Sequence, residues 1–162
     1  MNLLILIPCF NTHKYTNNLI SEIKDYTNKD IVIIDDGSSP ALKINFDYEN
    51  VHLLRNEQNQ GKGQTLLTGF RYALNNGYTH VVTMDGDIQH SPQDLNKFIS
   101  PSSNIHFVFG AREFKRPMPF HRILSNSITS FIISLFVNKK IMDSQCGYRR
   151  YKLDVLDLTK ID

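Results

Sequence analysis

Two aspartates separated by one glycine, Asp85 and Asp87, are the side chains of this 162-residue chain that most clearly indicate chemistry. They directly follow the apolar segment 80–84, and Gly86 between them lets the backbone approach a ligand closely. Two carboxylates at the end of one strand can bind the same hard divalent cation, and Gln89 can add an amide oxygen. We therefore expect Asp85, Asp87 and Gln89 to bind Mg²⁺ or Mn²⁺, which would neutralise a diphosphate leaving group. Asp-Gly-Asp is also an ordinary polar turn, so position in the fold decides between the two.

A second acidic pair, Asp35 and Asp36, follows another apolar segment. A carboxylate at the end of a strand can accept hydrogen bonds from a ribose or a base. The same residues, together with Gly37 and Ser38, are equally typical of an Asx-type turn. The sequence leaves both interpretations of this pair open.

Lys62 lies between two glycines, in a segment that could approach a phosphate. The phosphate loop of nucleoside triphosphatases requires Ser or Thr after its lysine, whereas Gly63 follows Lys62 here. A glycine-rich helix start can still place backbone N–H groups near an anion. We therefore expect anion binding at Lys62 without the phosphate-loop fold.

Other reactive residue types argue against hydrolytic and zinc chemistry. No serine has the G-x-S-x-G setting of a hydrolase nucleophile, and the six histidines show no metal-ligand spacing. His80 and His106 lie in strand-like segments and are expected to be structural, whereas His90 could face the acidic triplet. Cys9 and Cys146 form no C-x-x-C pair, which is typical of free thiols in a reducing compartment.

The composition is that of a globular protein, with 41% hydrophobic and 21% charged residues. A net charge of +2 does not indicate nucleic acid binding. Basic residues gather in the last third, which fits an anionic partner such as a phosphate or a membrane surface, or a solvated basic face. Residues 2–7 lack the features of a signal peptide and are expected to form a strand. The apolar segment 128–137 is about half as long as a bilayer-spanning helix, so it indicates at most an interfacial helix.

The elements that must position these residues alternate between strand and helix. Hydrophobic periodicity predicts strands over 3–7, 31–34, 51–54, 80–84 and 105–109, helices over 15–28, 64–75 and 120–137, a helix start at Ser91, and a short strand or loop within 143–151. Such alternation predicts an α/β fold, with a mostly parallel sheet and helices on both faces. Because ligands of such sheets bind beyond the carboxyl ends of the strands, we expect the polar segments 8–12, 35–39, 85–89 and 110–112 to share one edge.

Taken together, these segments resemble the family 2 glycosyltransferases of GT-A (Rossmann-like) fold. The similarity is greatest to the branch with dolichyl-phosphate mannosyltransferase and bacterial polyprenyl-phosphate sugar transferases. Six segments carry it, in the order of the family and over nearly the whole chain: Ile7–Asn11, Ile34–Ser38, Asn59–Gly63, Asp85–His90, Gly110–Arg112 and Asp143–Arg149. The chain differs from that branch at Phe10 and Thr12, where Tyr and Glu are frequent.

The resemblance implies a role for each segment. Pro8 and Asp36 would contact the nucleoside, Asp85, Asp87 and Gln89 would hold the metal and the donor diphosphate, and Arg112 would bind a phosphate through its bidentate guanidinium. Arg122 and Ser125 would be candidates for the acceptor phosphate. The full set of expected substrate-binding residues is Pro8, Phe10, Asp35, Asp36, Lys62, Asp85, Arg112, Arg122 and Ser125, and the expected catalytic residues are Asp87 and Arg112.

The reaction implied is inverting transfer of a hexose from a nucleotide-diphosphate sugar to a polyprenyl (dolichyl-type) phosphate. An acceptor phosphate is already an anion at neutral pH, so this reaction needs no strong general base. A glycan or other hydroxyl acceptor would need one, and Asp143 is the candidate. A catalytically inactive nucleotide-sugar-binding module is the third alternative.

The resemblance also predicts where the protein acts and how far its domain extends. Residues 120–137 would lie at a membrane surface, or alternatively pack in the core, and we expect a cytoplasmic protein that is peripheral at the inner face of the membrane. No nucleic acid partner is expected. We expect a single domain over 1–162 that lacks the C-terminal part of the family, because relatives continue beyond Gln145–Arg149.

Overall fold

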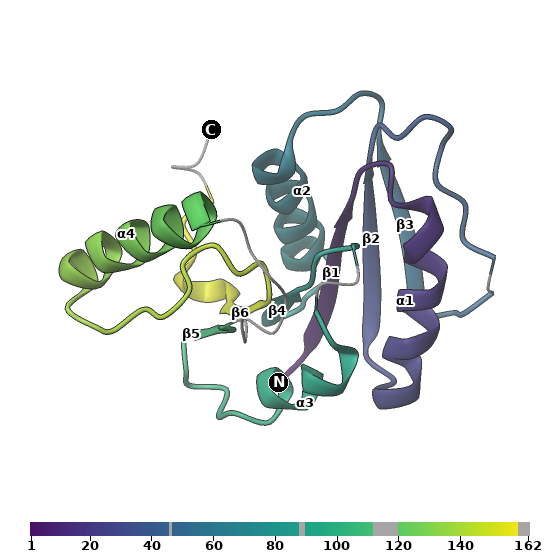
Figure 1. Ribbon diagram of the computed structural model, residues 1–162. Helices are drawn as coiled ribbons and strands as arrows, with labels where there is room; N and C mark the ends of the chain where they lie inside the picture. Colours follow the sequence, from purple (N-terminus) through teal and green to yellow (C-terminus); the bar gives the residue numbers. More distant parts are fainter. Residues whose placement is uncertain (46, 88–89, 112–119, 159–162) are drawn as a thin grey trace.

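A single mixed sheet organises the fold of the computed structural model, which describes residues 1–45, 47–87, 90–111 and 120–158, and the side chains of all these except 120–123. Within these residues the sheet has six strands in the order β3-β2-β1-β4-β6-β5 (Figure 1). The strands are β1 (Leu3–Cys9), β2 (Asp30–Asp36), β3 (Val51–Asn56), β4 (His80–Thr83), β5 (Phe107–Phe109) and β6 (Arg149–Lys152). The predicted mostly parallel α/β fold is confirmed.

One strand, β6, is antiparallel to the other five described strands. β1 pairs in parallel with β2 and β4, and β2 pairs in parallel with β3. β6 is antiparallel to both β4 and β5, so β5 points in the same direction as β4. Thr83 and Phe109 are both opposite Arg149, so the ends of β4 and β5 lie level. The described residues that follow β1, β2, β4 and β5 therefore lie at one edge of the sheet, as expected.

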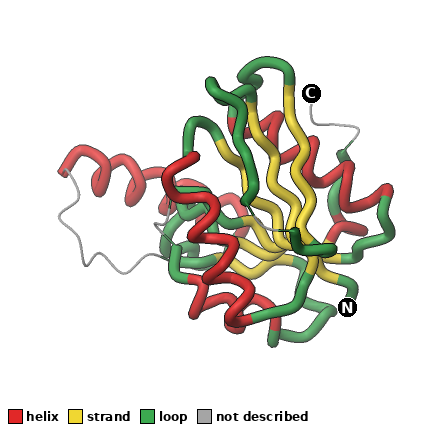
Figure 2. The backbone as a smooth tube through the Cα atoms, turned by 90° about the vertical axis from the view of Figure 1, so that its right-hand side faces the viewer, coloured by secondary structure: helices red, strands yellow, loops and turns green. Residues whose placement is uncertain are grey.

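Helices cover both faces of the sheet (Figure 2). The sequence of β1 explains this arrangement. Its side chains point alternately to the two faces of the sheet, and all of them from Leu3 to Ile7 are buried. Leu3, Ile5 and Ile7 pack against α1 (His13–Tyr26) and α3 (Leu95–Ile99), whereas Leu4 and Leu6 pack against α2 (Lys62–Asn75). A strand that is buried on both faces must be apolar throughout, as its sequence is.

Several predicted boundaries differ from the structure. β5 begins at Phe107 instead of 105, and β4 ends at Thr83. The helical spacing in 64–75 also predicts that Leu74 points inward, but Leu74 has 43% of its surface exposed, whereas its neighbour Ala73 is buried. The predicted helix start at Ser91 is a 3₁₀ turn (Pro92–Asp94) that leads into the short α3, and Ser91 makes no side-chain capping hydrogen bond.

The helix predicted over 120–137 has those bounds, as α4 (Phe120–Val137), and it extends away from the sheet (Figure 1). Its exposed apolar side chains, here called the apolar surface of α4, are Leu124, Ile128, Phe131, Ile132, Ile133, Leu135, Phe136 and Val137. Asn126 and Ser130 are buried instead, and they bind Asp143 and Ser144 of the segment after the helix. Among the described helices, none is long and apolar enough to cross a membrane. Because its apolar side chains are exposed, α4 is not a core-packing helix.

Candidate functional site

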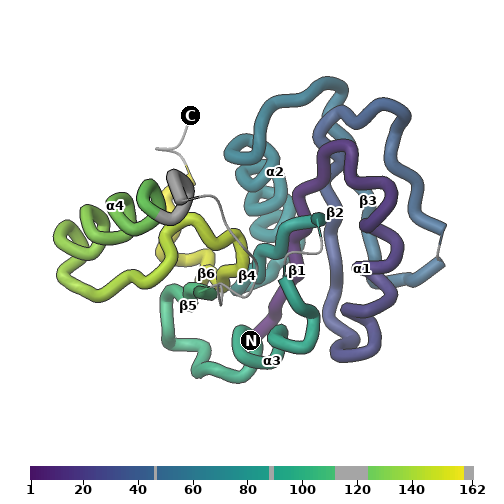
Figure 3. The backbone as a smooth tube through the Cα atoms, in the orientation of Figure 1, coloured from purple at the N-terminus to yellow at the C-terminus, as the bar shows by residue number. Residues whose placement is uncertain are grey.

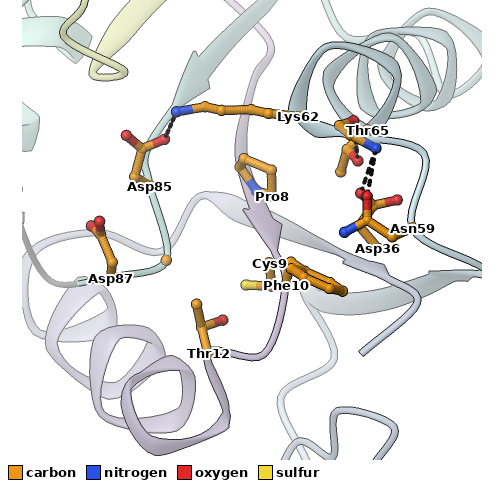
Figure 4. A pocket seen from close by; sticks show the side chains of 12 residues that line it. Pro8, Cys9, Phe10, Thr12, Asp36, Asn59, Lys62, Thr65, Asp85 and Asp87 are labelled. Atoms are coloured by element: carbon orange, nitrogen blue, oxygen red, sulfur yellow. Dashed lines mark hydrogen bonds and ion pairs between the residues drawn. The ribbon is translucent and has the colours of Figure 1, made fainter. Parts of the chain in front are cut away.

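A pocket of about 300 Å³ opens at the carboxyl edge of the sheet, where the sequence predicts ligand binding. It lies between the ends of β1, β2 and β4 and the start of α2 (Figure 4). The residues that line it are Pro8, Cys9, Phe10, Thr12, Asp36, Asn59, Gly61, Lys62, Thr65, Asp85, Gly86 and Asp87. Most of the expected donor-binding residues are thus brought together by segments up to 79 positions apart in sequence, from Pro8 to Asp87.

Asp85 has a partner on each carboxylate oxygen. The Nζ of Lys62 lies 2.5 Å from Oδ1, and Nε2 of His90 lies 3.4 Å from Oδ2. Burial by itself would raise the pKa of Asp85, but the hydrogen bond with His90 and the ion pair with Lys62 lower it to about 2. The side chain is therefore a carboxylate at neutral pH. The expectation that His90 faces the acidic triplet is confirmed.

Asp87 lines the same side of the pocket as Asp85 (Figure 4). Within the described residues there is no group of three or more His, Cys, Asp or Glu side chains that could hold a metal ion. Two carboxylates that face one pocket still fit a divalent cation of the Mg²⁺ type, which binds one or two carboxylates and takes its other ligands from phosphates and water. Gln89, the third expected ligand, lies outside the described residues.

Asp36 fixes the loop that leads into α2. Its Oδ1 accepts hydrogen bonds from Nδ2 of Asn56 (2.8 Å) and from the backbone N–H of Gln60 (3.0 Å), and its Oδ2 accepts one from the backbone N–H of Gly61 (2.9 Å). Burial opposes ionisation here, but these hydrogen bonds outweigh it and lower the pKa of Asp36. Asp36 therefore both lines the pocket and positions Lys62, which follows Gly61 and begins α2.

Asp35 is not among the residues that line the pocket. Its Oδ1 accepts a hydrogen bond from the backbone N–H of Ser38 (3.0 Å), and its Oδ2 accepts one from Leu42 (3.1 Å) and pairs with Arg55. Only 1% of its side chain is exposed. The geometry is that of the turn that the sequence offered as one interpretation, and the carboxylate holds this turn together.

The end of β1 and the residue after it also line the pocket. Pro8, within β1, and the half-exposed ring of Phe10 both line it, and their contact with a nucleoside stays a prediction. Cys9 is a buried free thiol, as predicted, and burial raises its pKa. A Cβ at Gly86 would lie 2.8 Å from the Sγ of Cys9, so only glycine allows this close approach between β1 and the acidic triplet.

The structure does not place the remaining expected residues in the pocket. Arg112 falls outside the described residues, and so does the side chain of Arg122. Ser125 is exposed on α4 and does not line the pocket. His80 is buried in β4, where its Nε2 contacts the carbonyl of Ser103, which confirms its structural role.

Sequence reasoning missed Gly147, which contacts the site from the far end of the chain. A Cβ there would lie 2.3 Å from Oδ2 of Asp85. The hydroxyl of Thr83 donates a hydrogen bond to the carbonyl of Gly147 at 2.7 Å, which holds the two segments together. Its position inside one of the six family segments is the only sequence signal, and that signal does not indicate which carboxylate it contacts.

The family follows from a comparison with known proteins. The family model described as glycosyl transferase family 2 matches residues 4–158. The chain belongs to glycosyl transferase family 2.

Two relatives have names that describe transfer to polyprenyl phosphates. The chain is 31% identical to the UDP-N-acetylglucosamine–dolichyl-phosphate N-acetylglucosaminyltransferase of Methanococcus voltae, over 94% of this chain and 70% of the relative. It is 26% identical to the undecaprenyl-phosphate mannosyltransferase of Micrococcus luteus, over 100% of this chain and 71% of the relative. The expected membership of family 2 is confirmed.

Solved structures confirm the GT-A fold of this glycosyltransferase family 2 domain. Glucosyl-3-phosphoglycerate synthase from Mycobacterium tuberculosis, solved with Mn²⁺, UDP and phosphoglyceric acid, superimposes with a TM-score of 0.68 at 15% identity. The similarity covers 94% of this chain but 56% of that structure. The chain thus spans little more than half of that enzyme, and about 70% of the two relatives above.

Proposed function

We propose that this glycosyltransferase domain binds a nucleotide-diphosphate sugar with Mg²⁺ or Mn²⁺ and transfers its hexose, with inversion, to a polyprenyl (dolichyl-type) phosphate. The observation that carries the proposal is that Asp85, Asp87 and Lys62 line one pocket at the carboxyl edge of the sheet, where Lys62 pairs with Asp85. The names of the two polyprenyl-phosphate transferases among the relatives support the acceptor class.

The proposed binding of the donor and the cation is supported by the charges and positions of the side chains in the pocket. Asp85 is held as a carboxylate, and Asp87 lines the pocket beside it, so together they offer oxygen ligands for one cation. Once bound, such a cation supplies Lewis-acid stabilisation of the leaving diphosphate. Lys62 adds a positive charge within the same pocket, and the ring of Phe10 offers an apolar surface to the base. In this proposal Asp87 and Arg112 act on the reacting diphosphate.

The proposed phosphate acceptor is supported by the burial of Asp143, the candidate general base for a hydroxyl acceptor. A hydroxyl acceptor would require a general base, and Asp143 was its candidate. The carboxylate of Asp143 is only 3% exposed, and Oδ1 accepts hydrogen bonds from Nδ2 of Asn126 and the backbone N–H of Gln145. It does not line the donor pocket. An acceptor phosphate, which needs no such base, fits these contacts better.

The apolar surface of α4 supports a peripheral position at a membrane. Leu135 and Phe136 expose 66% and 86% of their surface, and Lys139 and Lys140 follow one residue after the end of the helix. An apolar helix face bordered by lysines is the pattern of a helix that lies in the interface of an anionic membrane. We therefore propose that the domain works at the cytoplasmic face of a membrane, where a lipid phosphate would be presented.

The test is a transfer assay that separates the three candidate functions. The chain is incubated with radiolabelled UDP- and GDP-sugars, Mn²⁺ and a short polyprenyl phosphate, and the lipid fraction is analysed by thin-layer chromatography. A labelled glycolipid that disappears in Asp87→Ala supports the proposal. Label on a hydroxyl acceptor alone would contradict the acceptor class, whereas donor binding without any product would indicate an inactive binding module.

A further inference from the structure

We infer that Lys62 couples cation binding to nucleoside diphosphate binding, because it shares the carboxylate of Asp85 with the cation. The inference rests on the proposed function, since both ligands belong to the same pocket. It assigns a positioning role to Lys62, in which the side chain exchanges partners when the diphosphate binds.

The starting point is the ion pair across the pocket. Lys62 is the first residue of α2, and its side chain extends over Pro8 to reach Asp85 (Figure 4). Its Nζ lies 2.5 Å from Oδ1, and Oδ2 of the same carboxylate contacts His90. Because Gly147 also packs against the carboxylate, only 23% of the side chain of Asp85 is exposed. A cation that binds Asp85 must therefore share this carboxylate with the ammonium group.

The backbone of Lys62 is fixed, whereas its side chain has room to move. Asp36 accepts hydrogen bonds from Gln60 and Gly61, and the hydroxyl of Thr65 donates one to the carbonyl of Gly61. The side chain of Lys62 is 55% exposed, and its four methylene groups form a flexible stem that can adopt several rotamers. An exchange of partners can therefore occur by rotation of this one side chain, without movement of α2.

A bound diphosphate offers the ammonium group a second anionic partner. Without the diphosphate, the ammonium group repels a divalent cation and occupies Oδ1 of Asp85. With the diphosphate, Lys62 can pair with phosphate oxygens, and Asp85 becomes available to the cation. Each ligand then strengthens the binding of the other by more than their direct contact provides, and by the same factor in both directions.

The experiment measures Mn²⁺ affinity by the electron paramagnetic resonance signal of free Mn²⁺, with and without saturating UDP or GDP. The variants are Lys62→Met, the charge-retaining Lys62→Arg, and Lys97→Met as matched control. Lys97 forms a comparable ion pair with Asp94, 2.6 Å between Nζ and Oδ1, outside the pocket. We expect Lys62→Met to bind Mn²⁺ several-fold more tightly than the wild type without nucleotide, and the coupling factor to fall by about fivefold or more.

Two results would contradict the coupling. One is an unchanged Mn²⁺ affinity of Lys62→Met without nucleotide. The other is an equal gain with and without nucleotide, which would mean that Lys62 acts only through its charge. A wild-type chain that binds no nucleoside diphosphate in the presence of Mn²⁺ would instead contradict the proposed function itself. Circular dichroism confirms that the variants are folded.

Discussion

Gly147 lies against the carboxylate of Asp85, so that a Cβ at this glycine would overlap Oδ2 at 2.3 Å. The two residues are 62 positions apart, and the antiparallel pairing of β4 with β6 brings them together (Figure 3). The backbone at residue 147 thus limits where the carboxylate of Asp85 can point. This contact leads to the first prediction.

Gly147→Ala should displace the carboxylate of Asp85 and weaken Mn²⁺-dependent UDP or GDP binding by about tenfold, equivalent to ~1.4 kcal/mol. The matched control is Gly63→Ala, because a Cβ at Gly63 meets no atom within 4 Å. Isothermal titration calorimetry measures both affinities. Equal binding by the two variants would show that the position of Asp85 tolerates the added methyl group.

Asp85→Asn and Asp87→Asn should each reduce Mn²⁺-dependent nucleotide affinity by roughly tenfold or more, because an amide provides a neutral ligand in place of a carboxylate. Nucleotide binding in excess EDTA should be weak and equal for both variants and the wild type. Asp25→Asn, on the exposed side of α1, serves as the control. If EDTA has no effect on wild-type binding, the metal assignment is wrong.

Acid should destabilise the turn that Asp35 holds. Burial disfavours the charged form, but hydrogen bonds from Ser38 and Leu42 and the contact with Arg55 outweigh it, so the pKa of Asp35 is lowered. A carboxyl group with a lowered pKa contributes stability above its unfolded pKa of about 4, and this contribution is lost as pH falls through the folded value.

Asp35→Asn should therefore lower the free energy of unfolding by about 1–3 kcal/mol at pH 7. The difference from the wild type should shrink as pH falls below about 4, because Asp35 is then protonated first in the unfolded chain and, below its lowered pKa, in the folded chain as well. Urea denaturation at pH 7, 4 and 3 measures this difference. A constant difference over this range would contradict the role of the charged carboxylate.

The apolar surface of α4 should bind anionic vesicles. The double variant Leu135→Gln, Phe136→Gln should lose co-sedimentation with vesicles that contain phosphatidylglycerol, because it removes exposed apolar contacts with the lipid. Its free energy of unfolding should change by less than about 0.5 kcal/mol, since both side chains are exposed. Tyr26→Gln is the control, an exposed aromatic residue on α1. Unchanged co-sedimentation of the double variant would exclude this surface as the membrane contact.

Local signals in the sequence were sufficient for the fold and for most of the pocket. The apolar run of β1 and the helical spacing in α1 and α2 predicted a parallel sheet with helices on both faces, and that prediction fixed the edge where Asp85 and Asp87 lie. Patterns of this kind depend on residues close together in sequence, so they can be interpreted without three-dimensional information.

Long-range contacts could not be predicted in the same way. The residue types alone do not distinguish Asp35, which is bonded within its own turn, from Asp36, which lines the pocket. The contact of Gly147 with Asp85 depends on the pairing of β6 with β4, and the pairing partner of a four-residue strand cannot be inferred from its own residues. The polar contacts of Asp143 with α4 are likewise set by tertiary packing.

The hydrogen bond from Thr83 to the carbonyl of Gly147 joins the end of β4 to the segment before β6, beside Asp85. A ligand that binds Asp85 in this arrangement stabilises chains in which β6 is paired with β4, and so it shifts the folding equilibrium toward them. Protection of β6 amides from hydrogen exchange should consequently rise with donor concentration.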